Sequence, residues 1–228
     1  MTQTTLICFF EYKGFKNKWL AFSRMGRPPI SLNAIDGLTF FKPLGTGSGN
    51  GFSIKPDFST FGFVTVFETE EQAKNFTVSN KIEKYKKTAS NFSIVFMKTI
   101  KSHGKWSKQN PFKSSKELDK KKPVAVITRA TIKPKLAYKF WKHVPAVSKS
   151  MDAYKELLYS KGIGEFPLLM QATFSIWSSA DAMMNYAYSN PKHAEMVKKT
   201  RELNWYSEEL FARFEPYRTE GNLIPKFL

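Results

Sequence analysis

The chain has 228 residues, 42% of them hydrophobic and 15% aromatic, so its apolar content supports a sizeable core and argues against a disordered protein. Lys and Arg number 36 against 19 Asp and Glu, and the net charge of +17 favours acidic proteins, anionic lipid headgroups or nucleic acid as partners. Cys8 is the single cysteine, which excludes a disulfide within the chain and predicts a buried thiol in a reducing cytosol. The N-terminus lacks a basic segment followed by an apolar core, and no run reaches roughly 18 apolar residues, so we expect neither a signal peptide nor a membrane-spanning helix.

The first half of the chain has the pattern of alternating strands and helices. The apolar run at residues 6–10 predicts the first strand, and residues 93–100 predict the strand that closes this half. Residues 61–67 also predict a strand, and a Thr-Glu-Glu segment at residues 69–71 supplies the hydroxyl and acids that favour a helix start. The Gly-rich segment at residues 45–51 lacks the Gly-Lys-Ser/Thr ending of a phosphate cradle, so we expect a turn or a loop over a ligand.

A Lys-rich segment follows. Nine lysines stand against one Glu and one Asp between residues 98 and 122, and Pro111 and Pro123 lie in the same stretch. Such a run is typical of an exposed connector, and its charge also suits the docking of an acidic protein. We therefore expect a first half at residues 1–102, a linker at 103–122 and a second half at 123–228.

The second half repeats the order of the first. Residues 124–131 and 208–214 predict its outer strands, and Pro134 is a favoured first-turn residue for the helix after the first of them. Residues 171–177 predict a further strand, which is followed by the helix-start signal Ser178-Ser179-Ala180-Asp181.

An internal repeat relates the two halves. The predicted strand at residues 61–67 matches residues 171–177 at a constant offset of 110. A Gly-x-Gly segment, typical of close backbone approach, occurs in both halves, at residues 45–47 and 162–164. Because both halves run β-α-β-β-α-β, we expect an α+β fold of two fused ferredoxin-like repeats that form a pseudo-dimer of the dimeric α/β-barrel kind.

Residues 61–67 also resemble the third strand of RNA-recognition motifs, whose aromatic side chains stack on bases. Three observations count against this interpretation. Ser59 and Thr60 stand where that motif has a basic residue and a Gly, the first strand lies too far upstream, and residues 171–177 have no aromatic pair. We therefore expect no nucleic acid partner and keep RNA binding as an alternative.

The chain has three histidines. His103 lies in the Lys-rich segment and is expected to be exposed, and His143 is expected at a polar or half-buried helix position. His193 follows Pro191, a favoured first helical residue, so it falls in the first turn of a helix, where the matching part of the first half has no histidine. A lone histidine is more often structural than a ligand, but a neutral imidazole here can bind iron through one nitrogen.

A set of segments spread along the chain is distinctive as a group. They are Phe41-Lys-Pro-Leu-Gly-Thr-Gly-Ser-Gly-Asn-Gly-Phe52, Gly104-Lys-Trp106, Pro111-Phe112, Thr128-Arg-Ala-Thr131, Phe140-Trp141, Pro145-Ala-Val-Ser148, Gly162-Ile-Gly-Glu-Phe-Pro167, Gln171-Ala-Thr-Phe-Ser-Ile-Trp177, His193 and Trp205-Tyr-Ser-Glu-Glu-Leu-Phe-Ala-Arg-Phe214. In this order they resemble the spheroidene monooxygenase family of carotenoid-oxidising enzymes, from about Leu6 to Arg218.

The resemblance implies an oxygen-dependent monooxygenase that installs a keto group on an acyclic carotenoid or a similar apolar substrate. It implies electrons from reduced ferredoxin or a similar acidic donor, and haem (iron protoporphyrin) as the cofactor. It also implies kinship with dimeric α/β-barrel haem proteins, in which a helix of the C-terminal half supplies the proximal histidine. His193 matches that placement and is the expected iron ligand.

On this interpretation, strand residues supply the rest of the site. Arg129, Gln171 and Thr173, with Thr131, are the candidates to hydrogen-bond oxygen or water, and Arg129 and Arg213 are the candidates to pair with haem propionates. Which of them face the site depends on one residue of strand register, so the sequence leaves the choice open.

Several alternatives stay open at this point. The same barrel could carry haem for a dehydratase or peroxidase-like reaction, or it could be the RNA-binding module described above or a structural barrel without a cofactor. We expect a cytoplasmic location, with peripheral contact at the inner membrane and a homodimer both left open.

Overall fold

The computed structural model describes residues 2–26, 34–49, 53, 55–142, 144 and 154–227, and only the backbone at positions 26, 192–194, 196, 197 and 201. His143 lies outside the described residues, so its expected position stays a prediction. No helix within the described ranges is long and apolar enough to span a membrane.

Four strands and three helices make up the first half. They are β1 (Thr4–Glu11), α1 (Phe15–Gly26), β2 (Leu38–Gly47), β3 (Pro56–Phe67), α2 (Glu70–Thr77), α3 (Asn80–Lys86) and β4 (Asn91–Gly104). The predicted helix start after residue 67 is confirmed, because Thr69 caps α2 and forms a capping box with Gln72.

The second half has the same order of elements. They are β5 (Val124–Ile132), the 3₁₀ helix η2 (Pro134–Leu136), β6 (Leu157–Phe166), β7 (Met170–Trp177), α5 (Ala180–Ser189), α6 (Pro191–Leu203) and β8 (Tyr206–Gly221). The helix after β5 begins at Pro134 as predicted, and Ser179 caps α5 through its hydroxyl.

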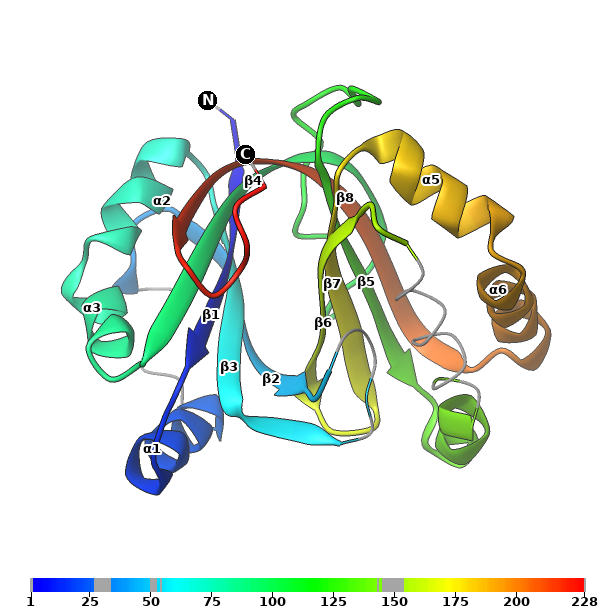
Figure 1. Cartoon of the computed structure of the whole chain (residues 1–228), viewed down its shortest axis with the longest axis horizontal. Coiled ribbons are helices and arrows are strands. Elements are labelled where there is room, and N and C mark those ends of the chain that lie inside the picture. The colour runs from blue at the N-terminus through cyan, green and yellow to red at the C-terminus, as the bar shows by residue number, and fades with distance from the viewer. Residues whose placement is uncertain are drawn as a thin grey trace.

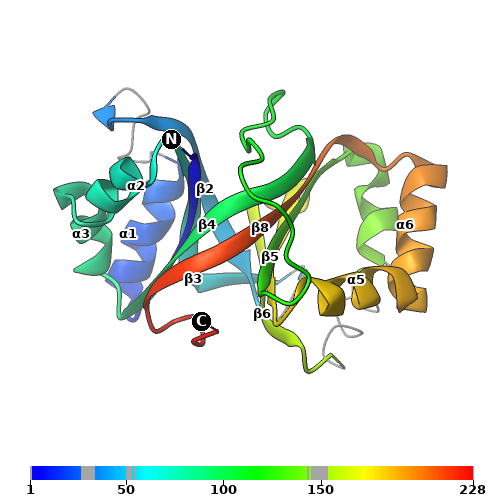
Figure 2. The same cartoon turned by 90° about the horizontal axis from the view of Figure 1, so that it is seen from above.

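All eight strands form one closed antiparallel barrel in the order β1-β3-β2-β6-β7-β5-β8-β4 (Figure 1). The helices lie outside it, with α1, α2 and α3 beside the first half and α5 and α6 beside the second (Figure 2). One apolar cluster fills the interior and draws on both halves, with Phe9 and Val64 from the first and Phe174 and Phe214 from the second. The predicted barrel is therefore confirmed.

The two halves meet at two very different seams. Strands β4 and β8 pair over eleven positions, whereas β2 and β6 pair at only two, Gly45 with Gly164 and Thr46 with Ile163. The two Gly-x-Gly segments found in the sequence are thus partners in one seam. A Cβ on Gly164 would lie 2.7 Å from the carbonyl oxygen of Met170 on β7, so the approach of β6 to β7 beside the seam requires glycine there.

A buried ionic network reinforces the short seam. Lys42 Nζ on β2 lies 2.8 Å from Glu165 Oε2 on β6, which joins the two strands through their side chains. The other Glu165 oxygen accepts hydrogen bonds from the Trp106 indole at 2.6 Å and from Arg129 Nη2 at 3.4 Å. Arg129 also pairs with Glu208 on β8, so one network ties four strands and the linker together at this end of the barrel.

Glu208 fixes the linker onto that end. Its carboxylate accepts the backbone N–H groups of Ser107 and Lys108 at 3.0 and 2.6 Å, in a turn where both residues have positive φ. Burial acts to raise the pKa of Glu208, but these N–H groups and Arg129 outweigh it and hold the pKa below its usual value. The indole of Trp106 is buried in the barrel core directly before this turn.

The RNA-recognition interpretation can be compared with the structure at the same strand. Phe61 and Phe63 are buried under the helices of the first half, so they form no exposed platform for bases. Gly62 between them is explained by packing, because a Cβ there would lie 2.3 Å from the Cys8 carbonyl oxygen.

The network predicts a large loss of stability when its central acid is neutralised. Glu165→Gln should lower the free energy of unfolding by about 3 kcal/mol, because it leaves the largely buried Lys42 without a counter-charge and leaves Arg129 with Glu208 alone. Urea denaturation measures this. The matched control is Glu220→Gln in the more exposed Arg218–Glu220 pair, which should change the same quantity by at most about 1 kcal/mol. Equal losses in the two variants would show that the network does not close the barrel.

Candidate functional site

The two halves can be compared residue by residue because their strands pair in the same register. Thr4 pairs with Phe67 in the first half, and Val124 pairs with Trp177 in the second. Strand β5 therefore matches β1 at an offset of 120, and β7 matches β3 at 110, in agreement with the repeat seen in the sequence.

Alternation along the strands shows which side chains point outward, toward the helices. In β5, Ala125 and Ile127 belong to the interior cluster, whereas Val124 and Val126 belong to a cluster with α5. Thr128 and Ala130 therefore face outward. By the same alternation Gln171, Thr173 and Ser175 of β7 face outward, and so does Arg213 of β8.

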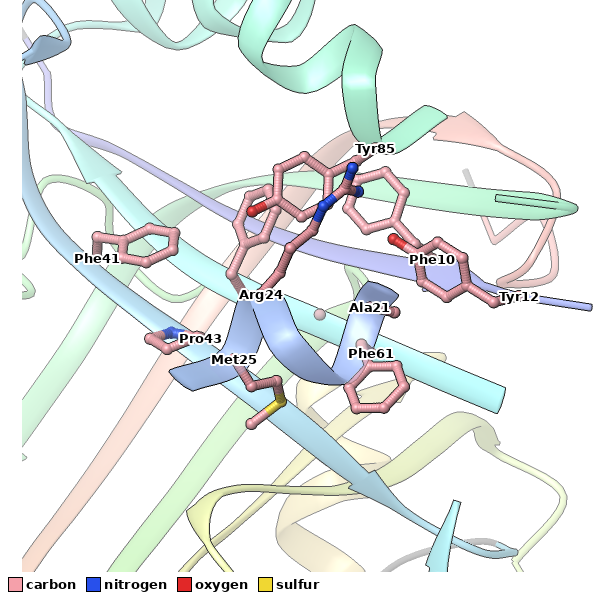
Figure 3. A pocket seen from close by; sticks show the side chains of 11 residues that line it. Phe10, Tyr12, Ala21, Arg24, Met25, Phe41, Pro43, Phe61 and Tyr85 are labelled. Carbon is pink, nitrogen blue, oxygen red and sulfur yellow. The ribbon is translucent and has the colours of Figure 1, made fainter. Parts of the chain in front are cut away.

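In the first half, aromatic rings fill this outer face. Phe10 and Phe63 pack at 5.7 Å between ring centroids, and Phe10 and Tyr85 of α3 at 5.3 Å. Figure 3 shows the rings of Phe10 and Tyr85 close to the guanidinium of Arg24 of α1, with Phe61 farther away, toward Met25. The void that remains among them is only about 20 Å³, too small for anything larger than a water molecule.

In the second half, small residues take the places of those rings. Ala130, Gln171 and Thr173 occupy the positions that match Phe10, Phe61 and Phe63. The neighbouring strand β6 brings Gly162 beside Thr173 and Ser160 beside Ser175. We call the outward-facing set Thr128, Ala130, Ser160, Gly162, Gln171, Thr173 and Ser175 the small-residue wall.

Apolar clusters border the small-residue wall at both ends. Trp177 and Tyr186 stack at one end with α5, and Phe140 and Trp205 pack at the other. Between these clusters the wall lacks large side chains of its own, although several of its members are buried. Compared with the first half, Ala130 and Thr173 are much smaller than the rings that they replace, and Gln171 puts a polar amide in the place of the third ring.

Two buried polar atoms lie on the same face without a partner. Ser160 Oγ and Arg213 Nε have no hydrogen-bond partner within the described part of the chain. The guanidinium of Arg213 lies 5.2 Å from the Phe211 ring, and its strand neighbour on β5 is Val126. Because buried polar groups are rarely left unpaired, these atoms fit a place where a ligand with acceptor oxygens would bind.

The structure brings some of the predicted site residues together and separates others. Gln171, Thr173 and Arg213 share the outer face, whereas Arg129 and Thr131 alternate to the barrel interior. Arg129 is 3% exposed and holds the ionic network with Glu165 and Glu208. A catalytic Arg129 stays a prediction, and its observed contacts are those of a residue that stabilises the barrel.

The predicted histidines lie at different places. The backbone of position 193 is in the first turn of α6, as expected, and its side chain lies outside the described residues. His103 is exposed on β4, as predicted, with its ring centroid 5.5 Å from that of Phe211.

A large cavity opens beside the small-residue wall, at the seam of β2 and β6. Its volume is about 810 Å³, within the range of small-molecule sites. Gln171 belongs to both the wall and the cavity. Most lining side chains are apolar and come from α1 and from the strand ends around the seam, namely Phe22, Met25, Phe58, Phe61, Ile163, Phe166, Pro167 and Leu168.

The sequence already shows that residues 171–177 lack the aromatic pair of residues 61–67, but only the RNA-binding interpretation used this difference. Neither the small-residue wall nor the cavity was predicted. The cavity had no such signal, because its lining comes from five separate elements.

Comparison with known proteins gives the family. No family model matches the chain. It is 31% identical over 223 residues to the spheroidene monooxygenase of Rhodobacter capsulatus, covering 96% of this chain and 92% of that protein. It is also 31% identical over 221 residues to the enzyme of the same name from Cereibacter sphaeroides, covering 96% and 68% of the two chains. The chain belongs to the spheroidene monooxygenase family.

Membership makes this chain an oxidoreductase of the monooxygenase class, as the sequence predicted. Among solved structures, an aldoxime dehydratase matches 94% of this chain and 82% of its own length, with a TM-score of 0.61 and 12% identity. At that identity the match supports the barrel fold alone.

The size difference between the two outer faces predicts an asymmetric result from reciprocal substitutions. Thr173→Phe should change the free energy of unfolding by less than about 1 kcal/mol, because the ring enters space that the strands leave free. The reverse change at the matching position, Phe63→Thr, should cost about 3–5 kcal/mol, because it opens a cavity in a packed cluster. Chemical denaturation of both variants measures this, and a Thr173→Phe penalty as large as that of Phe63→Thr would show that the wall is already covered.

Proposed function

We propose that this chain is a haem-dependent monooxygenase that oxygenates an acyclic carotenoid or a similar apolar polyene. The small-residue wall and α6 would hold the haem between them, and His193 would supply a ligand to its iron. The observation that carries the proposal is the replacement of Phe10, Phe61 and Phe63 by Ala130, Gln171 and Thr173 on the outer face of the second half, the side of the barrel on which α6 lies (Figure 2). A flat, apolar group with charged edges suits a sheet face that has lost large aromatic side chains of its own.

The position of His193 on α6 supports its role as ligand. Two ion pairs, Lys199–Glu195 and Lys198–Glu202, mark the solvent side of this helix. Thr200 hydrogen-bonds the Tyr206 hydroxyl on β8 and so lies on the opposite side, toward the sheet. Position 193 precedes Thr200 by seven residues, which is close to two full turns, and therefore falls on the same sheet-facing stripe.

The remaining residues have roles that follow from their chemistry. Bound haem would supply an iron centre for the activation of dioxygen. Among the polar groups on the wall, Ser175 already accepts a hydrogen bond from the Trp177 indole. We assign the hydroxyl of Thr173 and the amide of Gln171, which also donates to the Phe166 carbonyl, to orient dioxygen and to hold or pass a proton. Arg213, whose Nε is free of any hydrogen bond in the described structure, would pair with a haem propionate.

The cavity supports an apolar substrate. A mostly apolar lining favours hydrocarbon, and the shared residue Gln171 gives the cavity contact with the proposed reaction site. Burial of the polyene there would also keep bulk water from the reaction.

The linker supports an acidic electron donor. Lys113, Lys120 and Lys121 are exposed on it, and such a surface attracts a negatively charged partner such as reduced ferredoxin. We propose that the donor docks there, that the protein acts in the cytoplasm, and that its halves are fused ferredoxin-like repeats with boundaries at 102/103 and 122/123. The matching strand registers of the two halves support the repeat.

Absorption spectroscopy tests the haem proposal. Protein produced with haem supply should show a Soret band, and His193→Ala should lose or strongly shift it because the proposed imidazole ligand is gone. The matched control is His103→Ala at the exposed histidine of β4, which should leave the band unchanged. Thr173→Phe should fold and yet bind less haem, because its ring occupies the proposed space. A full Soret band that His193→Ala leaves intact would refute the ligand assignment.

A further inference from the structure

Helix α1 carries an exposed aromatic stripe. Phe15, Trp19 and Phe22 are 84%, 62% and 48% exposed. Their spacing of four and three residues puts them on one side of the helix. Their rings follow one another at centroid distances of 6.5 and 6.0 Å. The opposite side of α1 is already used, since Ala21 and Met25 pack on the first half of the barrel. The stripe is thus a second apolar face, left to solvent.

The stripe continues into the rim of the cavity. Phe22 contacts Phe58 at 6.2 Å, and both residues line the cavity. Across the opening, the turn between β6 and β7 presents Phe166 and Leu168, which are also exposed. In Figure 1 this turn and α1 lie along the same lower edge of the molecule. A continuous apolar surface of this kind marks an interaction site.

The charges around this surface are mostly positive and indicate a negatively charged partner. Helix α1 holds Lys16, Lys18 and Arg24 and has no acidic residue. The helix that follows β5, at the same edge in Figure 1, adds exposed Lys135, Lys139 and Lys142 beside exposed Tyr138. Aromatic side chains flanked by lysines suit the interface of an anionic bilayer, where the rings enter the headgroup region and the cations meet the phosphates.

The carboxylates nearest to this surface do not oppose binding to an anionic bilayer, because each is paired with a lysine. Asp57 at the cavity is paired with Lys161 at 3.0 Å, and Glu165 is paired with Lys42 at 2.8 Å. Burial acts to raise the pKa of Asp57, but hydrogen bonds from Ser59 and Lys161 lower it on balance, so it stays charged and matched. The surface therefore presents a net positive charge to a membrane.

We propose that the aromatic stripe of α1, together with the cavity rim, is a membrane-docking surface that seats the protein on an anionic bilayer. The cavity then opens toward the lipid, and an apolar polyene passes from the bilayer into it without crossing water. The entry route rests on the proposed function, whereas the docking itself does not.

Vesicle binding tests the docking with a built-in reporter. Trp19 is the one exposed tryptophan of the five, since Trp106, Trp141, Trp177 and Trp205 are buried. Vesicles of phosphatidylglycerol and phosphatidylcholine should therefore shift the tryptophan emission to shorter wavelength, through Trp19 alone. Trp19→Phe should keep the binding, measured by flotation, and lose most of the shift.

The stripe itself is tested by a triple variant, Phe15→Ser with Trp19→Ser and Phe22→Ser. These side chains are exposed, so thermal stability should hold, while partitioning onto the vesicles should fall about a hundredfold or more because three buried rings are lost. The control is Lys120→Gln with Lys121→Gln and Lys122→Gln in the linker, at the opposite edge of Figure 1, which should weaken binding by less than about tenfold.

The proposal is overturned if wild-type protein does not float with the anionic vesicles, or if the linker variant loses as much binding as the stripe variant. Either result would mean that net charge, or a protein partner, explains the surface instead. The Soret band of the stripe variant separates this question from the haem proposal. An unchanged band with lost vesicle binding concerns the docking surface alone, and loss of the band in His193→Ala concerns the haem site alone.

Discussion

The closure of the barrel at the seam between β2 and β6 constrains everything else in this molecule. Two backbone pairs are too few to hold two strands, so the seam depends on the Glu165 carboxylate and the Lys42 and Arg129 charges around it. Because side-chain ion pairs join β2 and β6, the two strands need few backbone hydrogen bonds and pair over a short length. The cavity opens beside this short paired region. Three of the segments that carry the family resemblance each contribute one residue to this network. They are 104–106 with Trp106, 128–131 with Arg129 and 162–167 with Glu165.

Two matching halves have been put to different uses. The first half fills its outer face with its own aromatic rings, and its open space lies at the edge of that face, in the cavity beside α1. The second half keeps the same backbone and register and yet replaces those rings with Ala130, Gln171 and Thr173. We propose that the second half uses this difference to enclose a ligand. The exposed stripe on α1 belongs to the packed half, which can present aromatic side chains to a membrane because its own core is complete.

Much of the fold could be predicted from the sequence, because the strands are long, apolar and repeated at a fixed offset. The helix starts at Thr69, Pro134 and Ser179 follow from capping chemistry that is local in the chain. The candidate site could be predicted less well from the sequence. Whether Arg129 or Thr128 faces the helices depends on one residue of register, which only pairing with β7 and β8 decides. The cavity draws on elements far apart in the chain, and no local pattern marks such a site.

The central claim is that a haem lies between α6 and the small-residue wall. Anomalous diffraction at the iron edge from crystals of the haem-loaded protein tests this most directly. The account predicts one iron peak on the helix side of β5 and β7, between position 193 of α6 and Thr128 and Thr173. A peak in the barrel interior near Arg129, or in the seam cavity beside Phe58 and Phe166, would contradict it.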